Sequence, residues 1–107
     1  MGISKEEAVK ALQTRDKLYV AYAQATKLPY VTCDEETFND QAWIFATEEE
    51  IKEFGKKCLE DKILLMGMRY EKKDFPRLYG TFYAIGVNSV VWTEGEEKIE
   101  VELSDIA

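Results

Sequence analysis

The side chains of this chain that could do chemistry are two cysteines, a surplus of carboxylates and six tyrosines, and there is no histidine. Without histidine, Ser-His-Asp and Cys-His mechanisms are excluded, and the commonest side chain that titrates near neutral pH is missing. Two cysteines without histidine cannot complete a closed zinc site, although carboxylates could still bind a hard cation. We therefore expect no catalytic, cofactor-binding or metal site, and we predict that the protein is not an enzyme.

The individual candidates support this prediction. Cys33 is followed by acidic residues, which disfavour the thiolate that a nucleophilic cysteine needs. Cys58 falls on the apolar side of a predicted helix, where it would pack as a small hydrophobic side chain. The acids within residues 34–40 superficially resemble a calcium loop, but the alternating ligand spacing and the central glycine are missing. We interpret this segment as a solvated loop.

Length, composition and charge limit the class of protein. With 107 residues, 46% of them hydrophobic and 33% charged, the chain is predicted to form one globular domain over residues 1–107. A net charge of −7 argues against binding to DNA or RNA phosphates, and fits either solubility or a basic protein partner. No stretch has the length of a membrane span and the N-terminus lacks the apolar core of a signal peptide, so we expect a cytoplasmic protein that binds no membrane.

The clearest structural pattern lies in residues 42–68. Thr47 and Glu50 form a capping box that starts a helix, and apolar residues follow at helical spacing: Ile51, Phe54, Gly55, Cys58 and Leu59. The apolar runs 43–46 and 63–66 on either side predict strands that are covered on both faces. The segment therefore predicts a β-α-β crossover with two parallel strands lying side by side.

The N-terminal part of the chain predicts one more helix and two more strands. Ser4 and Glu7 repeat the capping box, and the helix that they start should end near Thr14. Residues 17–23 have strand composition, and residues 30–32 predict a second, antiparallel strand that follows Pro29.

The C-terminal part predicts a third helix and a hairpin. Asp74 and Pro76 mark the start of the helix, and Gly86 marks its end. Residues 87–93 and 98–103 then form two antiparallel strands, the second with apolar side chains inward and charged side chains outward. Together these elements predict an α+β fold with three helices and a mixed sheet of five to six strands.

Aromatic residues near the C-terminus are the candidate binding residues. The third helix carries Tyr79 and Tyr83 on more than one side, so it is either sandwiched within the domain or presents an aromatic patch to a partner. Trp92 in the final hairpin is an anchor if it points outward and part of the core if it points inward. Gly80 in the third helix would permit a close approach by another element.

Three segments carry a resemblance to a known family: Leu-Tyr-Val at 18–20, the aromatic strand and Thr-Glu-rich helix within 44–66, and Gly-Val-Asn at 86–88 before a Val-Val strand and a glycine turn. In these segments the chain resembles the SseB N-terminal domain family, named for enhanced serine sensitivity, over residues 17–103. Ala21 stands where family members often have proline. The resemblance implies a fold, an intracellular bacterial protein and a binding or accessory role, and it supplies no catalytic residues.

These observations leave three hypotheses. The first is a non-enzymatic protein-binding or accessory domain that uses the aromatic surface, either with an unidentified protein partner or as a homodimer. The second is a small acidic immunity or inhibitor protein whose loop 34–40 and last strand neutralise a basic partner. The salt dependence of binding distinguishes the first two hypotheses, because charge-steered binding weakens with ionic strength and aromatic docking does not. The third, an enzyme working through carboxylates, requires two acids that converge in a deep pocket.

Overall fold

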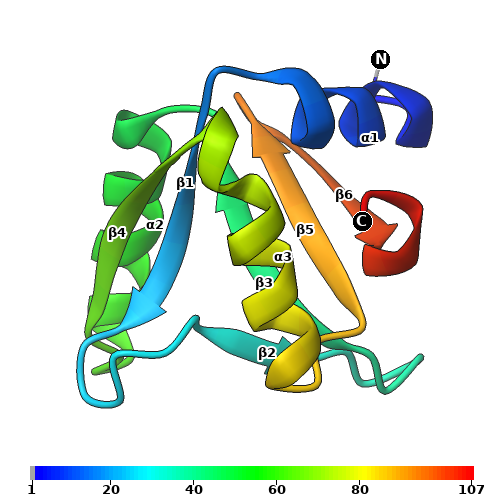
Figure 1. Cartoon of the computed structure of the whole chain (residues 1–107). Coiled ribbons are helices and arrows are strands. Elements are labelled where there is room, and N and C mark those ends of the chain that lie inside the picture. The colour runs from blue at the N-terminus through cyan, green and yellow to red at the C-terminus, as the bar shows by residue number, and fades with distance from the viewer. Residues whose placement is uncertain (1) are drawn as a thin grey trace.

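The computed structural model describes residues 2–107, and over these residues the chain forms three α-helices and six β-strands (Figure 1). Along the chain the elements are α1 (Lys5–Thr14), β1 (Lys17–Ala23), β2 (Val31–Cys33), β3 (Asp40–Phe45), α2 (Glu48–Glu60), β4 (Leu65–Glu71), α3 (Phe75–Ala84), β5 (Ser89–Glu94) and β6 (Glu97–Glu102), with short 3₁₀ turns at Lys72–Asp74 and Leu103–Asp105. All three predicted helices are confirmed.

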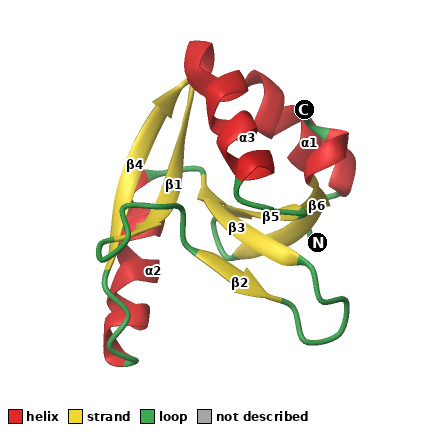
Figure 2. Cartoon of the chain, turned by 60° about the horizontal axis from the view of Figure 1, so that its bottom comes forward, coloured by secondary structure: helices red, strands yellow, loops and turns green. Residues whose placement is uncertain are grey.

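The strands form one mixed sheet. Its order is β4-β1-β3-β5-β6, and β2 pairs with β3 outside this path. β5 is parallel to β3, while the β1–β3, β1–β4, β2–β3 and β5–β6 pairs are antiparallel. Helix α2 covers one face of the sheet, and α1 and α3 lie on the other (Figure 2). The predicted α+β class, with a mixed sheet and a C-terminal hairpin, is therefore confirmed.

The crossover from β3 through α2 to β4 is present, but its strands are not neighbours. β3 and β4 run in the same direction because each is antiparallel to β1. The prediction that they lie side by side is wrong, since β1 lies between them. Val20 and Ala21 of β1 point to opposite faces and are both fully buried. A strand that is apolar on both faces takes a central position, where helices cover it from both sides.

Strand β4 begins later and ends later than the sequence indicates. The predicted strand over 63–66 begins only at Leu65, and it continues beyond the predicted end to Glu71. β4 lies at the edge of the sheet, and its residues from Gly67 to Arg69 are exposed. Coverage of residues 63–66 on both faces is therefore a wrong prediction, since Leu64 is 55% exposed and Leu65 and Met66 are only partly buried at this edge.

The predicted second strand is present as β2, antiparallel as expected. Its main partner is β3, with which it forms a hairpin around the polar loop 34–39. Contact with β1 is limited to a single bridge between Tyr22 and Pro29. A proline at this point suits an isolated bridge, because it has no N–H to donate to a continuous ladder.

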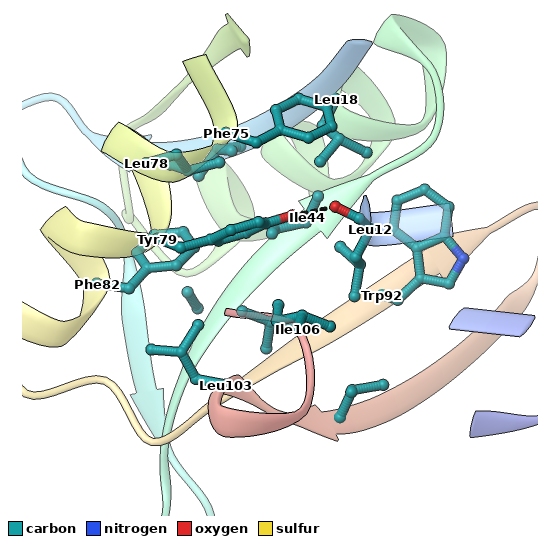
Figure 3. Close-up of a cluster of buried hydrophobic side chains, with 14 of the residues drawn as sticks. Leu12, Leu18, Ile44, Phe75, Leu78, Tyr79, Phe82, Trp92, Leu103 and Ile106 are labelled. Atoms are coloured by element: carbon teal, nitrogen blue, oxygen red, sulfur yellow. Dashed lines mark hydrogen bonds between the residues drawn. The ribbon is translucent and has the colours of Figure 1, made fainter. Parts of the chain in front are cut away.

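The larger of two apolar clusters lies between the sheet and the helices α1 and α3 (Figure 3). Its largest members without exposed surface are Trp92, Phe82, Leu12, Leu18, Ile44 and Leu78. Since every strand of the sheet contributes side chains to this cluster or packs against it, including β2 through Val31, this face carries most of the apolar burial of the fold.

The smaller cluster lies under α2. Ala21, Phe45 and Ile51 are buried there, and the ring of Phe54 stacks on Trp43 with a centroid distance of 4.9 Å. A Cβ added to Gly67 would lie 3.2 Å from Cγ2 of Ile51, so glycine permits the helix to approach β4 closely. Leu59 is exposed, although the sequence pattern placed it on the buried stripe.

The two predicted capping boxes have different outcomes. At α1 both halves form, since Ser4 accepts from the Glu7 N–H and the Glu7 side chain reaches back to Ser4. At α2 only Thr47 caps, accepting from the N–H of Glu50 at 3.3 Å. Glu50 instead accepts from the N–H of Gly95 at 2.7 Å, and thereby ties the start of α2 to the β5–β6 turn.

Helix α3 begins with Pro76 in its first turn and is followed by Gly86 in the left-handed region at φ 86°, as predicted. Asp74 lies at the N-cap position as predicted, but its side chain makes no capping hydrogen bond. A Cβ on Gly80 would meet nothing within 4 Å. The close approach expected at Gly80 is therefore absent.

Candidate functional site

The three aromatic residues proposed for binding differ in burial. Trp92 is fully buried and points into the cluster beneath α1 and α3 (Figure 3). Tyr79 is also buried, and its hydroxyl donates to the carbonyl oxygen of Leu12 at 2.5 Å. Tyr83 is 49% exposed and donates to the carbonyl oxygen of Ala107 at 3.0 Å. Of the three, only Tyr83 presents a large surface to a partner.

Tyr79 and Tyr83 line a shallow groove of about 500 Å³ between α1, α3 and the C-terminal residues. The remaining lining residues are Gln13, Lys72, Phe75, Pro76, Gly80, Ile106 and Ala107. This groove carries one cation and no carboxylate side chain. It has apolar surface but few polar groups that would select one ligand over another.

Burial raises the pKa of several titratable side chains. Cys33 and Cys58 are both free, and burial together with nearby Asp61 raises the pKa of the Cys58 thiol. Burial and a hydrogen bond with Tyr70 raise the pKa of Tyr22, which disfavours a phenolate. Among residues 2–107, no group of three Cys, Asp or Glu side chains could hold a metal ion. Within the same residues, no helix has the length and hydropathy that crossing a bilayer requires.

Glu100 forms the most connected polar cluster of the fold. Its carboxylate accepts from Ser89 Oγ at 2.5 Å, from Gln41 Nε2 at 2.8 Å and from Asn39 Nδ2 at 3.5 Å. These hydrogen bonds, that of Ser89 foremost, lower the pKa of Glu100. Ser89 is fully buried and out of reach of a substrate, so the cluster joins β3, β5 and β6 and is not a nucleophile with its base. Glu100 was predicted to point outward into solvent, and its half-buried carboxylate corrects this.

Glu100 is expected to make stability depend on pH. A carboxyl whose pKa is lower in the folded state contributes stability above its unfolded pKa of about 4.3, and loses it as the pH falls through the folded pKa. We expect the urea midpoint of Glu100→Gln to lie below that of the wild type at pH 7 and to approach it at pH 3. Glu102→Gln, on an exposed residue of the same strand, is the control. An unchanged difference between Glu100→Gln and wild type across this pH range would contradict the assignment.

A concave surface with a volume of about 820 Å³ lies between α2 and β4. We call it the α2–β4 groove. Its apolar lining comes from α2, from the loop that follows and from β4: Ile51, Gly55, Leu59, Ile63, Leu64, Leu65, Met66 and Gly67. Leu59 and Leu64 are each 55% exposed. The groove therefore offers apolar contact area that no part of the described chain covers.

The polar lining of the α2–β4 groove is mainly basic. Lys52, Lys56 and Arg69 line it together with a single carboxylate, that of Glu48. Each cation has one acidic neighbour at 3.3–3.8 Å, and every side chain in these pairs is more than half exposed. Exposed pairs of this kind contribute little, so the cations can exchange their neighbours for a bound anion. The three cations thus face three carboxylates, of which only that of Glu48 lines the groove.

The sequence pattern does not predict the α2–β4 groove. Leu59 and Leu64 were assigned to buried faces, and periodicity alone cannot show that α2 covers only part of its side of the sheet. Two glycines in the sequence could have indicated the groove. Gly55 faces open space, and Gly67 lies beneath Ile51, so small residues on both walls keep the groove open.

Fold and groove together define a small α+β domain with an open sheet edge and one basic-rimmed apolar groove. No protein-family model, curated protein or solved structure matches the chain. The resemblance to the SseB N-terminal domain family therefore stays a prediction.

Proposed function

We propose that this is a non-enzymatic protein-binding domain whose α2–β4 groove binds an acidic segment of a partner protein that carries a large apolar side chain. The observation that carries the proposal is the combination of exposed apolar residues and three cations in one groove. Apolar surface supplies affinity, while the cations select acidic partners and steer them to the site.

The shape of the groove favours a peptide segment over a compact small molecule. Its lining on α2 extends from Glu48 to Leu59, which at about 1.5 Å per residue is roughly 16 Å of helix. At about 3.3 Å per residue, this length matches some five residues of extended chain. β4 forms the other wall and is hydrogen-bonded to β1 alone, so its free edge offers backbone groups to such a segment.

A short peptide tests the proposal. Ac-Asp-Glu-Leu-Glu-Asp-NH₂ is expected to shift the backbone amide NMR signals of Gly55, Gly67 and their neighbours, and a version with lysine in place of every acid should not. Raising the salt concentration from about 0.05 to 0.5 M should weaken binding at least several-fold, because the Debye length shortens. Equal binding of both peptides would contradict the proposal.

Two glycine variants locate the site. A side chain at Gly55 would enter open space inside the α2–β4 groove, so Gly55→Leu should leave the fold intact and abolish peptide binding. A side chain at Gly80 meets equally open space but lines the smaller groove beside Tyr79 and Tyr83. Gly80→Leu should therefore bind the peptide normally. The opposite result would assign binding to the tyrosine-lined groove and overturn the proposal.

A second candidate function is an acidic inhibitor or immunity protein that neutralises a basic partner. The observation that favours it is the loop 34–39, which together with Asp40 carries four carboxylates and no cation. Charge reversal in this loop, as in Glu35→Lys with Glu36→Lys, would abolish such an activity and leave peptide binding in the α2–β4 groove unchanged. The two functions are thus separable by the surface at which a substitution acts.

A further inference from the structure

Phe38 is the most exposed large hydrophobic residue in the described chain. Its side chain is 76% exposed at the tip of the β2–β3 hairpin. Its backbone has a φ of 60°, a left-handed conformation that is uncommon for a bulky side chain. Aromatic residues fixed at an exposed tip are typical anchors of protein interfaces.

The loop that carries Phe38 is held by its own hydrogen bonds. The carboxylate of Asp34 accepts from the N–H groups of Glu36 at 2.8 Å and Thr37 at 3.0 Å, which lowers the pKa of Asp34. The N–H of Phe38 donates to the carbonyl oxygen of Asp34 at 2.8 Å. The backbone therefore directs the side chain of Phe38 outward, which reduces the backbone ordering cost of binding.

The hairpin tip and the α2–β4 groove are complementary in charge and polarity. Residues 34–40 contain one large apolar side chain and four carboxylates: Asp34, Glu35, Glu36 and Asp40. The groove contains uncovered apolar surface and three cations. Glu48 is the one carboxylate among its lining residues, and Glu53 and Glu71 pair with two of the cations in exposed ion pairs. The ring of Phe38 can therefore cover the apolar surface of the groove, and the carboxylates around it can pair with the cations of the groove.

One molecule cannot make this contact within itself. In Figures 1 and 2 the β2–β3 loop lies well away from α2 and β4, and β1 separates β3 from β4 in the sheet. We propose that the Phe38 hairpin of one copy of this chain occupies the α2–β4 groove of a second copy. This inference rests on the proposed function, because it names one acidic, apolar segment that the groove accepts.

The contact joins two different surfaces, so it is heterologous. Each copy keeps one free hairpin and one free groove after the first contact, and the assembly grows head to tail or closes into a ring. A single hairpin in a groove is small compared with a standard interface of about 1,600 Å², so the association is weak and depends on concentration.

Analytical ultracentrifugation of the whole chain tests the inference. The weight-average mass of the wild type is expected to rise with concentration and to fall again in high salt. Phe38→Ala should weaken association at least tenfold, because it removes the anchor. Leu28→Ala, which removes another exposed apolar side chain from a different turn, should associate like the wild type.

A mixing experiment identifies the two surfaces. The double variant Lys52→Glu, Lys56→Glu keeps its hairpin but loses the groove charge, whereas Phe38→Ala keeps its groove but loses the anchor. Neither variant should associate alone, and an equimolar mixture should form a 1:1 dimer that does not grow further. No other pairing of surfaces gives this pattern.

Two results would overturn the inference. One is a wild type that stays monomeric up to roughly 1 mM. Its free energy of association would then be weaker than about 4 kcal/mol. The other is a mixture of the two variants that stays monomeric while the wild type associates. Either result leaves the proposed function intact if the acidic peptide still shifts the signals of Gly55 and Gly67. If the peptide does not bind and the wild type does not associate, both the proposed function and this inference are wrong.

Discussion

Replacing Trp92 with alanine is expected to lower the free energy of unfolding by roughly 3–5 kcal/mol, the usual cost of removing a buried aromatic side chain. Trp92 has no exposed surface and lies in the largest apolar cluster, between Ile44 of β3 and Ile99 of β6 in the strand register. Arg15 also lies over its ring at 5.6 Å. Domains of this size are stable by about 5–15 kcal/mol, so the variant should be near the limit of folding.

Urea denaturation followed by far-UV circular dichroism measures this loss. Trp92→Phe keeps most of the apolar volume and should cost less than the alanine variant, which provides a measurable value if Trp92→Ala does not fold. Tyr83→Ala, on a half-exposed side chain of the same helical layer, is the surface control. A cost below about 1 kcal/mol for Trp92→Ala would contradict the buried position, because that is the range of ordinary surface substitutions.

Removing the hydroxyl of Tyr79 is expected to cost about 1–3 kcal/mol, because a buried acceptor then loses its partner. The hydroxyl donates to the carbonyl oxygen of Leu12, one of the last carbonyls of α1, and the two groups are buried between α1 and α3 (Figure 3). Burial also raises the pKa of Tyr79, so the phenol remains a donor throughout the neutral range. Tyr79→Phe changes this single bond while the ring stays in place.

Tyr83→Phe is the matched control for Tyr79→Phe. Its hydroxyl donates to Ala107 at the exposed C-terminal end, where water can replace it. We expect a change within about 0.5 kcal/mol, as for most surface substitutions. Equal costs for the two tyrosines in urea denaturation would show that the bond from Tyr79 to Leu12 does not join the helices.

Local features of the fold could be predicted from the sequence. Ser4 and Thr47 cap helices that begin where the polar-to-apolar pattern changes, and Gly86 and Gly95 take the positive φ values that the turns require. These features depend on side chains and backbone within a few residues of one another, so their physics is contained in short segments of sequence.

Long-range features could not be predicted in the same way. The pattern shows that residues on one face of α2 are apolar, but only the assembled sheet decides that Ile51 is covered and Leu59 is not. Strand β1 lies between β3 and β4 because it is apolar on both faces. Predicting this position requires comparing the faces of all the strands with one another. The same holds for predicting binding residues from sequence. Trp92 would be a binding anchor on one face of the hairpin, but it lies on the other face and belongs to the core.

The central position of β1 also determines how the chain can reach this fold. Strand β1 is synthesised first, yet its hydrogen-bonded partners come later, and the contact between Tyr22 and Tyr70 spans 48 positions. Closing such a loop costs entropy before any packing compensates for it. The chain is therefore expected to fold more slowly than a helical bundle of equal length, with a rate-limiting transition state in which β1 has already met its late partner β4.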